Sequence, residues 1–245
     1  MEKKLDLNAD IGEQFGIYGI GNDEALMPYI TSANIACGFH AGDPDTMYNT
    51  VDLCKKFNVN VGAHPGYPDL KGFGRRSIPM SHDELYNLVV YQVGAMLGMC
   101  KALDVKLVHV KPHGALYNDL AKDYDASKMV VKAILSIDSG IVMFGLPGSQ
   151  MEKACLDYGL CFYAEVFADR AYEDDGSLVD RKLPGALIKS VSEAVERMME
   201  LRRSGRIKTI NNNWINLKAD TICLHGDGEN AILLAEALSR AFSDS

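Results

Sequence analysis

The sequence predicts an α/β fold in which seven parallel strands and their connecting helices form a β/α barrel. Two observations support this fold. Short apolar segments alternate with longer segments of helical periodicity, an order typical of parallel strands joined by right-handed crossovers. The chain has 245 residues, of which 47% are apolar, which suits one barrel domain covering 1–245. A doubly wound open sheet is the alternative architecture.

The strand candidates are short, apolar and often rich in β-branched or aromatic residues. We expect strands at 4–9, 33–39, 59–63, 106–111, 141–145, 160–167 and 220–225. The segments between them have the periodicity of amphipathic helices. We expect these helices near 43–57, 82–103, 125–138, 148–158, 185–203 and 228–242.

Three local patterns refine these boundaries. Ser81 with Glu84 forms a capping box at the start of the second helix. Pro184 is expected in the first turn of the fifth helix, where proline is tolerated. Residues 206–219 do not fit the strand–helix repeat, and they predict a hairpin that turns at 211–213.

Charge and composition exclude several classes of protein. The chain has 25 basic and 33 acidic residues, a net charge of −8, and no basic block, so neither a nucleic acid nor a membrane surface is an expected partner. It shows no signal-peptide pattern and no apolar run long enough to span a membrane. We therefore expect a cytoplasmic protein whose six cysteines, which form no CxxC pair, are reduced.

Polar side chains cluster at the carboxyl-terminal end of each predicted strand, and those within one strand are separated by an even number of residues. Parallel strands buried on both faces are normally almost entirely apolar. Residues two apart point to the same face, so these side chains are expected to converge at the carboxyl-terminal mouth, where barrel active sites lie. The set comprises Asp6, Asn8, Asp10, Asn34, His40, Asn60, His64, His109, Lys111, His113, Glu165, Asp169, His225 and Asp227.

Within this set, Asp10, His40 and His64 offer one carboxylate and two imidazoles from neighbouring strands. Such a group suits zinc or another divalent metal with an open coordination position. Their spacing matches no short metal-binding motif, and a metal-free role in acid–base chemistry and hydrogen bonding fits equally well.

Two loops carry further candidates. Residues 64–76 combine glycine and proline turns with Arg75 and Arg76, which suit a carboxylate or phosphate ligand. Residues 169–181 follow the sixth strand directly, begin with Asp169 and Arg170, and have the composition of an active-site lid. The alternative for both loops is a solvated surface segment with its charges paired.

Seven sequence blocks distributed along the chain resemble the LamB/YcsF family. The blocks are DLNADIGE (6–13), ANIACGFHAGD (33–43), GAHPGYPD (62–69), GFGRR (72–76), VKPHGALY (110–117), EVFADRAY (165–172) and CLHGD (223–227). The resemblance runs nearly end to end and is loosest at 206–219. It implies a TIM-like, seven-stranded barrel of the deacetylase-superfamily type.

The resemblance also implies an activity. Family members are assigned as the A subunit of a 5-oxoprolinase, which converts 5-oxo-L-proline, ATP and water to L-glutamate, ADP and phosphate together with subunits B and C. No Walker loop is present, so the ATP site is expected elsewhere in the complex or to be of an unfamiliar type. The chain alone should therefore have little or no ATP-dependent activity. The sequence is also compatible with a homo-oligomer.

Opening a lactam needs charge stabilisation at the carbonyl oxygen, a proton for the leaving nitrogen and an activated water. Lys111 or a metal would polarise the oxygen, Asp10 or Glu165 would act as base, and a histidine would donate the proton. The histidine candidates are His64, His113 and His225. Substrate-binding candidates are Asn8, Asn34, Arg75, Arg76, Asp169 and Arg170.

Two other functions remain compatible with the same residues. One is a stand-alone metal-dependent deacetylase or amidohydrolase that uses Asp10, His40 and His64. The other is a non-catalytic subunit that binds 5-oxoproline and presents it to its partners. Metal analysis distinguishes the first of these, and turnover with and without partners distinguishes the second.

Overall fold

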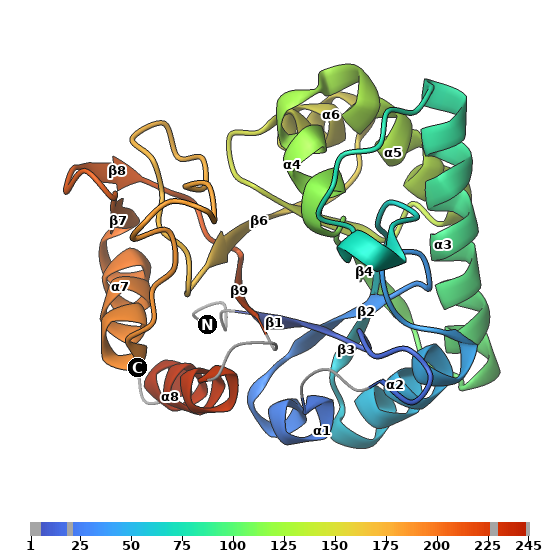
Figure 1. Ribbon diagram of the computed structural model, residues 1–245, viewed down its shortest axis with the longest axis horizontal. Coiled ribbons are helices and arrows are strands. Elements are labelled where there is room, and N and C mark those ends of the chain that lie inside the picture. The colour runs from blue at the N-terminus through green and yellow to red at the C-terminus, as the bar shows by residue number, and fades with distance from the viewer. Residues whose placement is uncertain (1–5, 19–21, 226–229, 244–245) are drawn as a thin grey trace.

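A closed ring of seven parallel strands forms the centre of the computed structural model, which describes residues 6–18, 22–225 and 230–243 (Figure 1). Neighbouring strands pair in the order β1-β2-β3-β4-β5-β6-β9, and β9 closes the ring against β1. The predicted parallel barrel is therefore confirmed, and the open sheet is excluded. The strands are β1 (Asp6–Ile11), β2 (Ser32–Ala36), β3 (Asn60–His64), β4 (Leu107–Val110), β5 (Val142–Gly145), β6 (Phe162–Phe167) and β9 (Thr221–His225).

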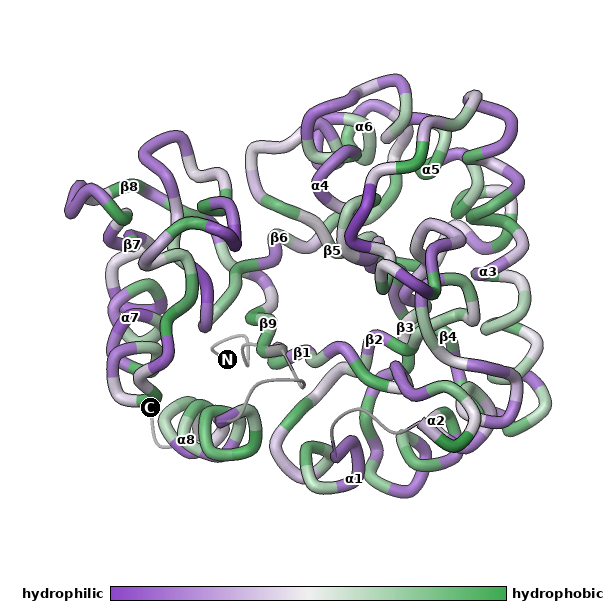
Figure 2. The backbone as a smooth tube through the Cα atoms, in the orientation of Figure 1, coloured by the Kyte–Doolittle hydropathy of each residue, from purple (hydrophilic) through white to green (hydrophobic). Residues whose placement is uncertain are grey.

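Helices surround this ring on its outside (Figure 1). Hydrophobic and hydrophilic residues alternate along them (Figure 2), and α2, for example, buries Met47, Val51 and Cys54 against the barrel. The helices are α1 (Asp23–Leu26), α2 (Pro44–Phe57), α3 (His82–Ala102), α4 (Gly114–Lys122), α5 (Tyr124–Ile137), α6 (Gln150–Tyr158), α7 (Val191–Ser204) and α8 (Ala231–Ser243), with short 3₁₀ turns η1 (Met27–Tyr29) and η2 (Leu70–Gly72).

The helix boundaries confirm one sequence prediction and correct two. Ser81 and Glu84 form the expected capping box at the start of α3. The prediction that the fifth helix begins at Pro184 is wrong, because α7 begins at Val191 with Ser190 as its N-cap. The preceding residues 181–186 form turns and bends, and Leu187 then makes an isolated antiparallel β-bridge with Arg170. Helix α4 was not predicted.

The segment 206–219 contains the predicted hairpin. Strand β7 (Arg206–Lys208) pairs antiparallel with β8 (Trp214–Asn216), and Asn212 in the turn has a left-handed φ of 66°. Asp174, in the loop after β6, accepts hydrogen bonds from Thr209 Oγ1 (2.5 Å) and Asn213 Nδ2 (2.9 Å). The hairpin therefore holds the 169–181 loop in place.

Strand direction divides the polar residues of the interior between two ends of the barrel. Asp6 is at the amino-terminal end, where its carboxylate accepts hydrogen bonds from Thr31, Ser32 and Thr221. Asn60 also begins its strand and is exposed. The expectation that these two residues join the carboxyl-terminal mouth is therefore wrong. Asp6 closes the opposite end of the barrel instead.

Gly62 in β3 faces the ring of His109 in β4, and the interior has no room there for a side chain. A Cβ at residue 62 would lie 2.0 Å from His109 Nε2, the atom that bonds Asn34. We therefore expect Gly62→Ala to lower the free energy of unfolding by about 1–3 kcal/mol. Denaturant unfolding measures this change.

The control for Gly62→Ala is Gly98→Ala in α3, where an added Cβ meets nothing within 4 Å. It should leave stability unchanged or raise it by up to about 1 kcal/mol, because alanine favours a helix. Equal effects of the two substitutions would contradict the close packing of Gly62 on His109.

Candidate active site

A cavity of about 440 Å³ opens at the carboxyl-terminal mouth of the barrel. Asp10 at the end of β1, His64 at the end of β3 and Lys111 just after β4 contribute to its lining. The first turn of α4 and residues 178–182 contribute further lining. Polar groups from strands distant in sequence therefore meet here, as the alternation of side chains predicts.

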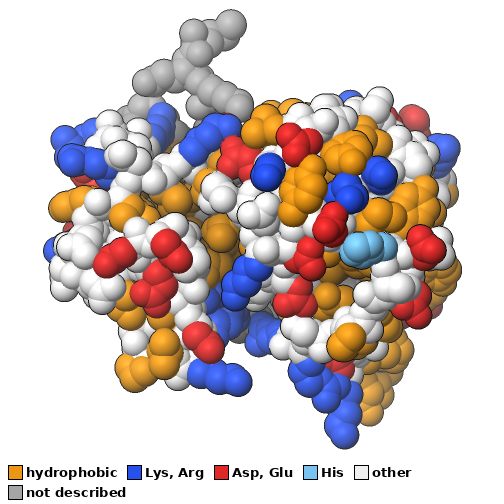
Figure 3. Space-filling view, turned by 90° about the horizontal axis from the view of Figure 1, so that it is seen from above, with side chains coloured by type: hydrophobic (Ala, Val, Ile, Leu, Met, Phe, Trp, Pro, Cys, Tyr) orange, Lys and Arg blue, Asp and Glu red, His pale blue; other side chains and the backbone are white. Residues whose placement is uncertain are grey.

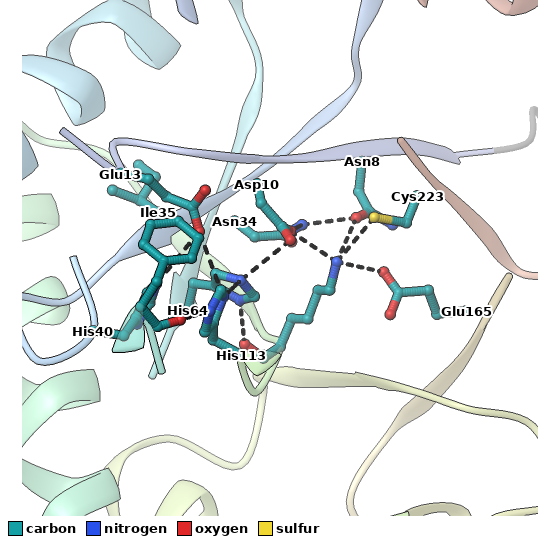
Figure 4. Close-up of polar contacts among 12 residues, drawn as sticks. Asn8, Asp10, Glu13, Asn34, Ile35, His40, His64, His113, Glu165 and Cys223 are labelled. Carbon is teal, nitrogen blue, oxygen red and sulfur yellow. Dashed lines mark hydrogen bonds and ion pairs between the residues drawn. The ribbon is translucent and has the colours of Figure 1, made fainter. Parts of the chain in front are cut away.

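The amine of Lys111 is the centre of a buried polar network (Figure 4). Its Nζ lies 2.8 Å from Asp10 Oδ1 and 2.9 Å from Glu165 Oε1. Cys223 Sγ at 3.0 Å and, more distantly, Asn8 Oδ1 at 3.4 Å are further acceptors that share the three N–H groups of the amine. One cation thus stands between two carboxylates in the barrel interior.

Lys111 remains protonated in this environment. Burial acts most strongly on its pKa and lowers it, but the negative charges of Asp10 and Glu165 and the neighbouring Cys223 together raise the pKa well above its usual value. Burial also raises the pKa of Cys223 well above its usual value, although Lys111 lowers it. Cys223 is therefore a neutral thiol and a weak hydrogen-bond acceptor.

A layer of amide and imidazole groups fixes the orientation of Asp10. Asn34 Nδ2 donates to Asp10 Oδ1 (2.8 Å) and to Asn8 Oδ1 (2.7 Å). The oxygen of Asn34 contacts His109 Nε2 at 2.7 Å, so that nitrogen is the donor. Burial and then the charge of Lys111 lower the pKa of His109 to about 3, so this ring is neutral. It stacks on Phe144 with 4.0 Å between ring centroids.

Three histidines and one glutamate form a second group beside this network (Figure 4). One nitrogen or oxygen atom from each of Glu13, His40, His64 and His113 lies within 4.8 Å of the others. Burial, followed by the charges of neighbouring groups, lowers the pKa of His113 to about 3 and lowers that of His40 well below its usual value. We name Glu13, His40, His64 and His113 the histidine cluster.

Basic side chains gather around the entrance of the cavity. Figure 3, seen at right angles to the view of Figure 1, shows Lys and Arg side chains along a hollow in the surface. Arg170 is buried and donates to Val179 O at 2.6 Å, and burial followed by the charge of Arg181 lowers its pKa only to about 10. It therefore remains cationic near neutral pH. The basic residues that line the cavity are Arg75, Lys111, Lys122, Arg170, Arg181 and Lys182.

Several predicted site residues do not line the cavity. Asn8, Asn34 and Glu165 are fully buried behind Lys111 and Asp10. The guanidinium of Arg76 makes two hydrogen bonds to Asp69, so it holds the 64–76 loop. Asp169 also lies outside the lining.

Two further predicted residues, His225 and Asp227, lie at or just after the end of the last strand. His225 ends β9 and its backbone is in register with Asp10, but its side chain is outside the described part of the structure. Asp227 lies outside the described residues altogether.

Glu13 is the main member of the site that sequence reasoning missed. It follows Gly12, whose φ of 66° turns the chain directly after β1 and ends the alternation on which the prediction relied. The available signal was its position within the block at 6–13. Cys223 lies in the apolar stretch of β9, and only its contact with Lys111 shows that it belongs to the polar network.

Comparison with known proteins assigns the family. The LamB/YcsF family model matches residues 5–245. The chain belongs to the LamB/YcsF family. A Staphylococcus aureus (strain Newman) protein, named as the A subunit of 5-oxoprolinase, is 49% identical over 235 residues, which cover 96% of this chain and 94% of that protein.

A solved structure, a lactam utilization protein from Thermus thermophilus, aligns with a TM-score of 0.94 and 39% sequence identity. The alignment covers 98% of this LamB/YcsF chain and 96% of that structure, so the two share the barrel nearly end to end. No helix within the described residues is both long enough and apolar enough to cross a membrane.

Proposed function

We propose that this LamB/YcsF protein binds 5-oxo-L-proline in the barrel cavity and opens its lactam, as the A subunit of an ATP-dependent 5-oxoprolinase. The observation that carries this proposal is a protonated lysine held between two carboxylates at the cavity. The similarity to the A subunit of a 5-oxoprolinase supports the choice of substrate. In the proposed reaction, ATP and water are consumed and L-glutamate, ADP and phosphate are formed with subunits B and C.

Lys111 is proposed to stabilise the charge that develops on the lactam carbonyl oxygen. A preorganised donor at such an oxygen is among the strongest contributions to catalysis. One of the Lys111 N–H bonds points to the Cys223 thiol, which is a weak acceptor. A substrate oxygen replaces this contact at small cost, while the two carboxylates keep the amine in place.

Asp10 is the better candidate for the general base. It lines the cavity, whereas Glu165 is fully buried and does not. Its Oδ1 is fixed by Lys111 and Asn34, and its Oδ2 lies 3.4 Å from His64 Nε2. We therefore assign proton abstraction from water to Asp10. The role of Glu165 is then to balance the charge of Lys111.

The basic entrance suits the anionic groups of the reaction. The substrate carries a carboxylate, and ATP coupling points to a phosphorylated lactam. Arg170 lies on the cavity wall, and its Nε has no hydrogen-bond partner among the described residues. We assign the substrate carboxylate to Arg170 and phosphate oxygens to Arg75 and Arg181, since guanidinium groups match both anions.

Reconstitution tests the proposed function. The chain is assayed for glutamate from 5-oxo-L-proline and ATP, alone and with the B and C subunits from the same source. We expect turnover with all three subunits and little or none with the isolated chain, because a Walker loop is absent from its sequence. Equal turnover by the isolated chain would contradict the need for partners, and none in any combination would contradict the proposed reaction.

The histidine cluster favours a second candidate function, a stand-alone metal-dependent amidohydrolase or deacetylase. Its imidazole nitrogens and carboxylate oxygen are the donor types that catalytic zinc sites use. This function requires the metal-loaded chain to hydrolyse 5-oxoproline or an acetylated substrate without ATP or partners. Measuring the isolated chain with added Zn²⁺ in the same assay separates the two functions.

A further inference from the structure

The histidine cluster has the dimensions of a metal site. His113 Nδ1 lies 2.9 Å from His64 Nε2 and 3.4 Å from Glu13 Oε1, and His40 Nε2 also lies 3.4 Å from Glu13 Oε1. Ligand atoms bound tetrahedrally to zinc at about 2.1 Å are separated by roughly 3.4 Å. All four atoms lie within 4.8 Å of one another, so a contraction of roughly 1 Å would bring them into one coordination sphere.

Backbone contacts determine which nitrogen each ring presents to the cluster. His64 Nδ1 lies 2.6 Å from Lys111 O, and His113 Nε2 lies 2.9 Å from Phe73 O. A carbonyl oxygen only accepts hydrogen bonds, so both of these nitrogens carry the proton. If each ring carries only that one proton, the remaining nitrogens, His64 Nε2 and His113 Nδ1, face each other with lone pairs at 2.9 Å. A cation between them removes this repulsion.

His40 completes the set. His40 is 1% exposed, its Nδ1 has no hydrogen-bond partner among the described residues, and its Nε2 has only the 3.4 Å contact with Glu13 Oε1. Burying such a group without a partner is unfavourable. The side chain is nevertheless held closely. Its ring stacks on His113 at 3.7 Å, and Cβ atoms at Gly66 and Gly74 would come within 2.6 Å of His40 Nδ1 and 2.7 Å of His40 Cβ.

The structure assigns Glu13, His40, His64 and His113 as a binding site for one divalent transition-metal ion, with zinc as the best match. Three nitrogens and one oxygen suit Zn²⁺, Co²⁺ or Fe²⁺, whereas Ca²⁺ and Mg²⁺ prefer oxygen ligands. The metal ligands expected from the sequence were Asp10, His40 and His64. The proposed site keeps both histidines but has Glu13 and His113 in place of Asp10. Glu13, His64 and His113 also line the cavity, so a bound ion would lie at its wall.

Metal binding by the full chain tests this site independently of the lactam reaction. After removal of metals with a chelator, Zn²⁺ is titrated by calorimetry, and Co²⁺ is added to record its absorption spectrum. We expect calorimetry to give one equivalent of bound Zn²⁺ per chain. The absorption spectrum of the Co²⁺-loaded chain should show the intense bands of a cobalt ion with a low coordination number. His40→Gln should weaken Zn²⁺ binding by more than the ~10–100-fold that loss of an outer-shell partner costs.

The control is His82→Gln, since His82 is exposed at the start of α3 and lies outside the cluster. It should bind Zn²⁺ like the unaltered chain. Equal losses in the two variants, or a stoichiometry near zero, would overturn the proposal. X-ray absorption of the zinc-loaded unaltered chain needs no variant. Three imidazole ligands and no sulfur are expected there, and a sulfur or all-water shell would contradict the site.

Discussion

Lys111→Met should lower the free energy of unfolding by about 3–5 kcal/mol, because it leaves the fully buried Glu165 and the neighbouring, partly buried Asp10 without their cation. In the reconstituted complex it should also reduce turnover by on the order of a hundredfold or more, the usual consequence of removing one charge stabiliser. Chemical denaturation and glutamate formation measure the two effects. Normal stability with near-normal turnover would contradict both roles of the lysine.

A double variant separates the structural role of Lys111 from its proposed catalytic role. Lys111→Met with Glu165→Gln removes one positive and one negative charge, so the net charge around Asp10 is the same as in the unaltered chain. Stability should then recover in large part, while turnover stays as low as in Lys111→Met. Recovery of turnover together with stability would show that the lysine only balances charge.

Asp10→Asn should reduce turnover of the reconstituted complex by about 10²–10⁴-fold, the range expected for loss of a general base. The substitution keeps the shape of the side chain, and Glu165 still pairs with Lys111. Stability should therefore change much less than in Lys111→Met. Single-turnover rates at saturating substrate measure the effect on the chemical step.

Glu165→Gln is the matched control for Asp10→Asn. It removes the same charge beside the same lysine, but from a residue that does not line the cavity. Its turnover should stay within about tenfold of that of the unaltered complex, well short of the loss expected for a base. Similar losses in both variants would mean that the charge on Lys111, and not the position of Asp10, sets the rate. The assignment of the base would then fail.

Much of the barrel follows from the sequence, because buried parallel strands and amphipathic helices have different periods. The spacing of Asn8 and Asp10 predicts that both point into the barrel, and their contacts with Asn34 and Lys111 confirm it. The same reasoning placed Asp6 at the wrong end. Spacing by two residues identifies a face of the strand but not the position along it.

The remaining parts of the site depend on contacts that no local pattern encodes. Arg76 donates a hydrogen bond to Asp69, seven residues earlier in the same loop, and no periodic pattern predicts this contact. Helix α4 was missed because Pro112 and Gly114 resemble a turn, yet its first residues line the cavity. The orientation of His113 depends on Phe73 O, a backbone atom from another loop.

A crystal structure of the assembled complex with 5-oxo-L-proline tests the central claim most directly. The account predicts the lactam in the barrel cavity, with its carbonyl oxygen within hydrogen-bond distance of Lys111 Nζ and its carboxylate at Arg170. Asp10 should face the carbonyl carbon with space for one water between them. A lactam bound on a partner protein, or in this chain but away from Lys111 and Asp10, would contradict the account.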